Sequence, residues 1–464
     1  MNKKIKYTIF LLMSALLLTS CGVITKTYKQ PDSTVADNLY RDVTFHDSAT
    51  LADKPWQNLF TDPALRNLIQ EGLDQNLDLK SAIERMNIAQ ATLTQSKLSL
   101  LPSVNGSADV TRSKLSEKAT QSTSLYSTLW EAGLNASWEL DIWGKLNSSK
   151  KAALASFLQT EAARRVIQTE LIANIADTYY TLLALDEKLA ITYQTVSVLQ
   201  KDVESMKLMK ESAIVTGAAV VQSQANLYSA EVSIPDLQQS IRETENTLCT
   251  LLGRAPGSIE RGTLDQQLAN KDLSIGVSSQ LLQNRPDVQQ AELALREAFE
   301  NVNVARASFY PSLTITANGG LSSLDLSDFL DNSLFYNLIG GLTQPIFSKG
   351  QNISNLKIAK AQQQEAYNNF KQSLLDAGKE VSNALYAYQM AEKKETSRIN
   401  QLQALEKSVE FTKELLRYSS STNYTDVLTS EQSLLSAQLS SVSDRQQKLQ
   451  AVVELYRALG GGWK

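Results

Sequence analysis

The sequence predicts a mixed α and β membrane protein that contains an internal duplication. Two very long runs carry apolar residues at every third or fourth position, which is typical of helices. Shorter segments alternate between apolar and polar residues, which is typical of strands with one polar face. The two halves of the chain also repeat each other at a nearly constant spacing, so each half should hold the same set of elements.

The N-terminal segment is expected to be processed and then to be extended. Residues 1–20 begin with lysines and continue with an apolar stretch, which is the pattern of a secretory signal peptide. They lead into Leu18-Thr19-Ser20-Cys21, which resembles a bacterial lipobox, so Cys21 should be lipidated and become the mature N-terminus. The alternative is plain cleavage with Cys21 as a bystander. Residues 21–60 should form an acylated tether, since much of this segment is polar and aperiodic.

Shorter helices precede the first alternating segment. Asp62 followed by Pro63 is a helix start signal, because the carboxylate can cap free N–H groups and proline suits the first helical position. A longer helix is expected over about 77–101, where Pro102 ends it.

The two long helical runs cover residues 145–216 and 351–459. At about 1.5 Å per residue, the first would reach roughly 100 Å, far more than one compact core can bury. Charged residues and glutamines interrupt both runs, which excludes membrane-spanning helices. A polar cluster at 419–423 divides the second run, so we expect two long antiparallel hairpins that turn near Gly217 and Thr422.

Four segments have the alternation of strands: about 103–112, 126–141, 312–321 and 334–346. The second alternates over about fifteen residues, which is long for a globular strand but suits a tilted transmembrane strand. The fourth alternates less regularly, because Phe335 and Ile339 fall on its otherwise polar face.

The repeat sets the expected domain organisation. Pro102 corresponds to Pro311, and the matching elements give a unit of helix, two strands and two long helices. We therefore expect a first repeat at 61–253 with its hairpin at 145–253, a linker at 254–276, a second repeat at 277–459 with its hairpin at 350–459, and a C-terminal tail at 460–464.

Four membrane strands cannot close a barrel alone. An open sheet edge in lipid would leave backbone groups unpaired at a cost of several kcal/mol each, and the smallest barrels have eight strands. Several chains must therefore share one barrel.

Composition argues against several classes of function. A net charge of −4 gives no reason to expect nucleic acid. His46 is the single histidine, and Cys21 and Cys249 are the two cysteines, so a zinc cluster is not expected. Cys249 lies in an apolar helical stretch and should be a buried thiol. The sequence contains no Gly-rich phosphate loop and no nucleophile with a histidine partner, so we expect neither an enzyme nor a cofactor.

A series of motifs resembles the outer-membrane efflux proteins of the TolC/OprM type, specifically their lipoprotein branch. The resemblance covers essentially the whole mature chain, and the motifs occur in the family's order: Cys21 after the lipobox, Trp56-Gln57-Asn58-Leu59-Phe60, Trp138-Glu139-Leu140-Asp141-Ile142-Trp143-Gly144, Arg285-Pro286-Asp287-Val288, Ala307-Ser308-Phe309-Tyr310-Pro311-Ser312-Leu313 and Gln344-Pro345-Ile346-Phe347. No single motif is decisive, but the series is specific.

This resemblance implies the assembly and the activity. It implies a homotrimer with a twelve-stranded barrel, four strands per chain, continuous with a long helical barrel in the periplasm. Its partners would be outer-membrane lipid, a periplasmic adaptor (membrane fusion) protein and an inner-membrane pump of the RND type. The channel would be a passive exit duct for small molecules. A duct for type I protein secretion is the alternative, and a periplasmic adaptor or coiled-coil lipoprotein is a third possibility that would need no strands.

The resemblance also suggests where the tunnel closes and where the adaptor binds. Adaptor contacts are expected at the hairpin tips, where Gly217 should allow a sharp turn: Val215, Thr216, Gly217 and Ala218 in the first tip, and Ser421, Thr422 and Asn423 in the second. Relatives often narrow the pore with an apolar residue and an acid one turn later, but the matching residues here are the uncharged Thr425 and Thr429. Our hypothesis is that Thr425, Asp426 and Thr429 line the closed end of the tunnel. The alternative is that they are ordinary helix surface at the tip. Asp426 and Glu431 are acids nearby, but both point to other helix faces than Thr429.

Overall fold

The computed structural model describes residues 24–30, 39, 50–114, 126–267, 281–418 and 424–464. The predicted signal peptide, Cys21, His46 and the tip residues Ser421, Thr422 and Asn423 lie outside this part of the chain. The chain divides into two compact units, which are described separately: one contains residues 85–161 and 290–370 with the N-terminal segment to 31, and the other contains 32–84, 162–289 and 371–464.

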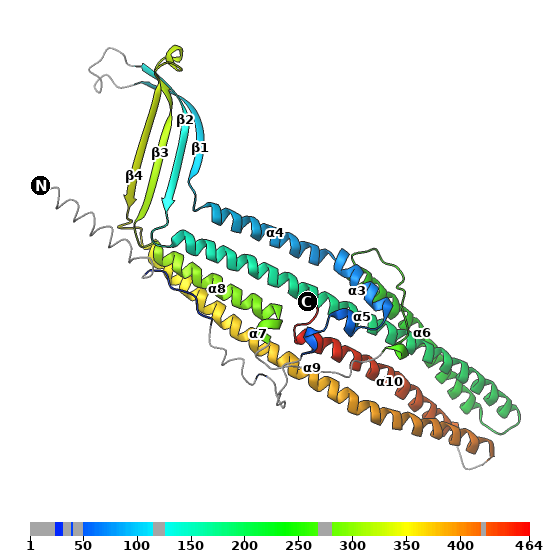
Figure 1. The fold of residues 1–464 in the computed structure, drawn as a ribbon. Coiled ribbons are helices and arrows are strands. Elements are labelled where there is room, and N and C mark those ends of the chain that lie inside the picture. The colour runs from blue at the N-terminus through cyan, green and yellow to red at the C-terminus, as the bar shows by residue number, and fades with distance from the viewer. Residues whose placement is uncertain (1–23, 31–38, 40–49, 115–125, 268–280, 419–423) are drawn as a thin grey trace. The chain divides into compact units, whose positions relative to one another are not determined.

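The order of the elements confirms the internal duplication (Figure 1). Each copy consists of a helix, two strands and two long helices. The first copy is α4 (Leu77–Leu98), β1 (Ser103–Lys114), β2 (Tyr126–Leu140), α5 (Lys145–Glu211) and α6 (Gly217–Leu251), and the second is α8 (Pro286–Ala307), β3 (Ser312–Ser323), β4 (Leu334–Thr343), α9 (Gln351–Tyr418) and α10 (Tyr424–Ala458). Shorter helices are α2 (Trp56–Leu59), α3 (Pro63–Gln75) and α7 (Leu281–Asn284), with 3-10 turns η2 (Leu51–Asp53), η3 (Leu264–Gln266) and η5 (Leu326–Asp328).

The helix boundaries have local causes. The Asp62 carboxylate accepts a hydrogen bond from the Ala64 N–H at 2.8 Å, which confirms the predicted start of α3. Asp141 caps α5 with both of its carboxylate oxygens, which accept from the N–H groups of Leu146 and Asn147 at 2.9 and 2.8 Å. β4 ends at Thr343 rather than at the predicted Ile346, because Pro345 has no N–H for a ladder.

The four strands form one antiparallel sheet in the order β1-β2-β3-β4, so β1 and β4 are its edges among the described residues. Cross-strand partners point to the same face. Trp138 pairs with Ile315 on the apolar face, and Ser137 pairs with Ser103 and Thr316 on the polar face. In a single chain the apolar face is bare: Tyr336 is 88% exposed and Leu338 is 71% exposed. The open edges need strands from further copies of the chain to pair their backbone groups, and the bare apolar face needs lipid to cover it.

An asparagine stands at the same level of the sheet in all four strands, on its polar face. Asn105 pairs with Asn135, Asn135 pairs with Asn318, and Asn318 pairs with Asn337. The Asn135 side-chain amide donates a hydrogen bond to the Asn318 side-chain oxygen at 2.5 Å. This asparagine row extends across the whole sheet.

The first long hairpin is held together by the predicted apolar stripe. Val196, Leu199 and Val203 of α5 form a buried cluster with Leu227 and Ala230 of α6. Their spacing of three and four residues places them on one side of the helix. Cys249 is also buried, as predicted, and its thiol donates to the Gly257 carbonyl oxygen at 3.4 Å.

Candidate functional site

The ends of the two hairpins meet around one buried apolar cluster. Met206 of α5 and Val220 of α6 pack with Tyr424, Val427 and Leu428 of α10. We call these five residues the tip cluster. Because it joins the first hairpin to the second, any separation of the hairpin tips must open it.

The turn of the first hairpin differs from the prediction at Gly217. The left-handed residue is Ala213, with φ 57°, and the Ala213 and Ile214 N–H groups bond to the carbonyl oxygens of Lys210 and Met209. This is the Schellman ending of a helix, in which glycine is more usual. Gly217 is instead the first residue of α6, and the Thr216 hydroxyl caps that helix by accepting from the Ala219 N–H at 3.3 Å. Ala213 lies three residues before the N-cap Thr216 and four before Gly217, so Ala213 and not Gly217 has the left-handed conformation in this turn.

Most of the predicted tip and gate residues that the structure describes lie at the surface of a single chain. Thr216, Gly217 and Ala218 are exposed and Val215 is half-buried against the tip cluster. Thr425, Asp426 and Thr429 are exposed on α10, and the Thr429 hydroxyl donates to the Thr425 carbonyl oxygen at 2.8 Å. The gate residues therefore lie on the side of α10 away from Tyr424, Val427 and Leu428 of the tip cluster.

Sequence reasoning missed the polar contacts that connect α10 to α6. The buried Tyr424 hydroxyl donates a hydrogen bond to the buried Ser223 hydroxyl oxygen at 2.8 Å. Burial raises the pKa of Tyr424 to about 12, so the phenol keeps its proton. The Gln432 side-chain amide donates to the Asn226 side-chain oxygen at 2.9 Å.

Three charged groups from three helices meet near the tip cluster. Lys413 of α9 lies with its Nζ 2.5 Å from Glu431 of α10 and 3.3 Å from Asp202 of α5. The Glu431 side chain is only 9% exposed, and burial and the adjoining Asp202 raise its pKa from 4.5 to about 7. One lysine thus faces two acids. We call Asp202, Lys413 and Glu431 the charge trio.

The described part of the chain has neither a metal-binding group of side chains nor a membrane-spanning helix. There, no group of three or more histidine, cysteine, aspartate or glutamate side chains could hold a metal ion. Also within those residues, no helix combines the length and apolarity needed to cross a bilayer.

Comparison with known proteins decides the family. The family described as outer membrane efflux protein matches residues 68–254 and again residues 277–461. The chain belongs to the outer membrane efflux protein family. As an outer-membrane efflux protein it is the channel component of an efflux system. Its structural neighbours are trimeric outer-membrane efflux channels, and this chain contributes a four-stranded sheet.

Individual relatives match this efflux protein over nearly its whole length. It is 30% identical over 456 residues to the probable outer membrane lipoprotein SilC of Salmonella typhimurium, covering 96% of this chain and 97% of SilC. It is 31% identical over 421 residues to the pyoverdine export outer membrane protein OpmQ of Pseudomonas putida, covering 89% of each chain. The open-state MtrE outer membrane channel of Neisseria gonorrhoeae superimposes with a TM-score of 0.85 at 27% identity, covering 95% of this chain and 98% of MtrE.

Proposed function

We propose that the trimer is a passive exit duct for small molecules such as drugs and toxic compounds. It would receive them from a periplasmic adaptor protein and an inner-membrane pump of the RND type. The sheet carries this proposal, because it has two open edges, an apolar face for lipid and a polar face of Ser, Thr and Asn for a water-filled lumen. The energy for transport would come from the pump, since the channel itself needs no chemistry.

The duct is tested by purifying the protein from its native membrane with its partners attached. We expect a trimer that forms pores in planar bilayers and that copurifies with an adaptor and an RND pump. Deletion of the gene should make cells sensitive to small toxic compounds. Copurification with a pump that exports proteins would instead support a type I secretion duct, and a monomer without pore activity would exclude both.

We also propose that Cys21 is acylated and that the hairpin tips bind the adaptor. SilC is named as a probable lipoprotein, which supports the first proposal. Fatty-acid labelling should be lost in a Cys21→Ser variant. For the tips, Val215 to Ala218 and Ser421 to Asn423 are the expected contacts, and cysteines placed at Thr216 and Ala218 should crosslink to the adaptor.

Thr425, Asp426 and Thr429 are proposed to line the closed end of the tunnel. Their exposure in a single chain leaves them available to face the pore. Replacing Thr429 and Asp426 by alanine should then raise the conductance in planar bilayers. Each of the three subunits would carry shorter side chains at the narrow level, so the pore would be wider there. A conductance equal to that of the parent channel would exclude this gate.

The charge trio should make opening of the hairpin tips depend on pH. In the closed tips the Glu431 carboxyl keeps its proton up to about pH 7, whereas a carboxyl exposed to water loses its proton near pH 4.5. Contact between the tips is therefore strongest in acid and weakens as the pH rises from about 4.5 to about 7. Above it, two carboxylates face the single Lys413. We therefore expect open probability in planar bilayers to rise from pH 5 to pH 8.

Glu431→Gln should hold the channel in its acid state at every pH in this range, because the amide is uncharged. The matched control is Asp177→Asn, since burial and Glu454 also raise the pKa of Asp177 to about 7 but Asp177 is not part of the trio. The Asp177→Asn channel should keep the pH dependence. If the pH profile of Glu431→Gln matched that of the parent, the trio would have no role in opening.

A further inference from the structure

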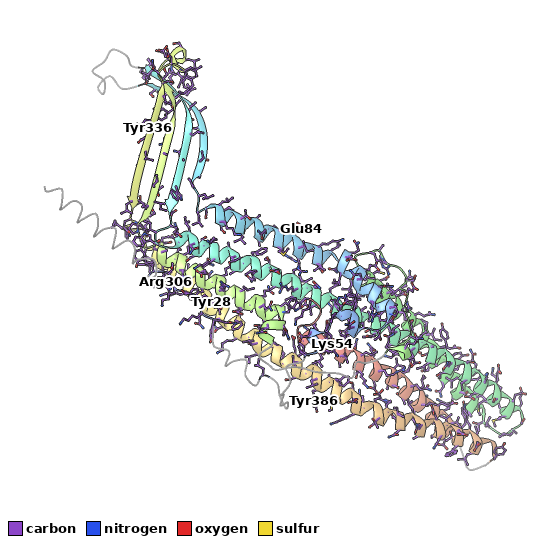
Figure 2. All side chains as sticks on the ribbon, viewed as in Figure 1. Tyr28, Lys54, Glu84, Arg306, Tyr336 and Tyr386 are labelled. Carbon is purple, nitrogen blue, oxygen red and sulfur yellow. The ribbon has the colours of Figure 1, made fainter. Side chains whose placement is uncertain are left out.

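The segment that follows Cys21 is bound to helix α8 rather than lying free. Residues 24–29, which we call the N-terminal arm, lie beside α8, where Figure 2 labels Tyr28 and Arg306. The Lys26 N–H donates to the Asn303 side-chain oxygen at 3.0 Å, and the Asn303 side-chain amide donates to the Lys26 carbonyl oxygen at 2.9 Å. One side chain thus pairs with both backbone groups of one residue, as a neighbouring strand would.

Asn303 is built for this pairing. It is fully buried, with 0% exposure, and its amide also donates to the buried Glu300 carboxylate at 3.1 Å. The two hydrogen bonds between Asn303 and the Lys26 backbone form only while the arm is bound, so they favour the bound arm over a released arm.

Side chains of the arm extend the contact to either side of Lys26. The Tyr28 ring meets Phe299 edge to face with 5.5 Å between the centroids, and the Arg296 guanidinium lies 5.9 Å from the Tyr28 ring centre. Thr25 fits over Gly144, where an added Cβ would lie 3.3 Å from the threonine methyl group. Ile24 is buried, with 8% exposure.

The chain length between the arm and Cys21 then limits where Cys21 can be. Cys21 and Ile24 are three positions apart, and a fully extended chain spans at most about 3.6 Å per residue, so their Cα atoms are within about 11 Å of each other. Gly144, which contacts Thr25, lies in the turn between β2 and α5. A bound arm would therefore keep a lipid on Cys21 within reach of this turn, where the sheet ends.

We propose that Asn303, Phe299 and Gly144 form a receptor for the N-terminal arm that fixes the lipid anchor at the end of the sheet. The partner of this surface is the chain's own mature N-terminus. The proposal rests on the proposed acylation of Cys21. Bound in this way, the acyl chains enter the bilayer beside the periplasmic ends of the strands, so anchor and barrel are set at one depth and assemble together.

Trypsin tests the binding of the arm, because Lys26 and Lys29 are cleavage sites within it. Asn303→Leu removes both hydrogen bonds to Lys26, and cleavage of the purified trimer after these lysines should become roughly tenfold faster or more. Asn301→Leu is the matched control on the exposed side of α8 and should behave like the parent. Tyr28→Ala should accelerate cleavage in the same way without touching the core, which covers the case in which Asn303→Leu fails to fold. Equal cleavage rates in the parent and the Tyr28→Ala protein would refute the receptor.

A double-mutant cycle tests whether the arm acts through the lipid. The readout is the fraction of protein found as heat-resistant trimer in the outer membrane. Tyr28→Ala should lower this fraction in the acylated protein but cause no further loss in the Cys21→Ser protein. An equal loss in both backgrounds would mean that the arm only stabilises the fold, and the anchoring role would be wrong. Fatty-acid labelling of the parent reports whether Cys21 is acylated, and trypsin cleavage reports whether the arm is bound. A failure of the proposed acylation is therefore distinguished from a failure of the receptor.

Discussion

Replacing Arg285 with Leu should destabilise the helical unit by about 3 kcal/mol, at the low end of the range for breaking a buried ion pair. The Arg285 side chain is only 5% exposed, and its guanidinium donates to Asp287 at 2.9 and 2.5 Å and to the Ala458 carbonyl oxygen at 2.9 Å. It also pairs with Glu380 at 2.9 Å. The low end applies because Asp287 and Glu380 keep 38% and 31% exposure, so water can partly solvate them once the arginine is gone.

The measurement is the melting temperature of the trimer in detergent. Arg242→Leu is the matched control, because Arg242 is exposed on α6, and it should leave the melting temperature unchanged. Arg285→Lys should be intermediate, since lysine keeps the charge but cannot donate two parallel hydrogen bonds to Asp287. A melting temperature for Arg285→Leu as high as that of the Arg242→Leu control would show that this network does not stabilise the fold.

Gly320→Val should prevent formation of the barrel. Gly320 of β3 pairs with Gly133 of β2, and a Cβ at Gly320 would fall on the Ala132 carbonyl oxygen and the Gly133 Cα. Backbone atoms of a paired strand cannot move aside without breaking the ladder, so β2 and β3 would separate. The heat-resistant trimer should be absent from the outer membrane, which gel electrophoresis of unheated samples measures.

Gly340→Val in β4 is the control for this substitution. A Cβ at Gly340 meets nothing within 4 Å, so the trimer should form normally unless the neighbouring subunit covers that position. Gly340→Ala and Gly320→Ala extend the comparison to the smallest side chain. Normal assembly of both Gly320 variants would show that the close approach of β2 and β3 is not required.

Much of the fold could be predicted because the relevant signals are local. The period of three to four placed the α5 stripe, and the period of two placed the strands within a few residues. The irregular Phe335 of β4 has a physical reason that only pairing reveals: it is the cross-strand partner of Gly320, and an aromatic residue opposite a glycine is a known way to support a strand. Periodicity assigns a residue to a face but does not identify its partner.

The candidate site was less predictable for the same reason. Asp202 and Glu431 are more than two hundred residues apart in the chain, and nothing local indicates that they meet. Gly217 was expected at the sharp turn because glycine is the usual left-handed residue, yet Ala213 takes that conformation here. The proposed gate residues remain predictions, because a pore lining depends on neighbouring subunits.

The asparagine row has a consequence for what a passing molecule meets in the closed trimer. Strands in such barrels tilt by about 35–45°, so a line drawn from partner to partner climbs at that angle instead of circling at constant height. With strands about 4.8 Å apart, the four amides of one chain climb about 9 Å along the pore axis. Three chains therefore present three rising rows of carboxamides around the pore wall. A solute that leaves one amide meets the next one slightly farther along the pore axis.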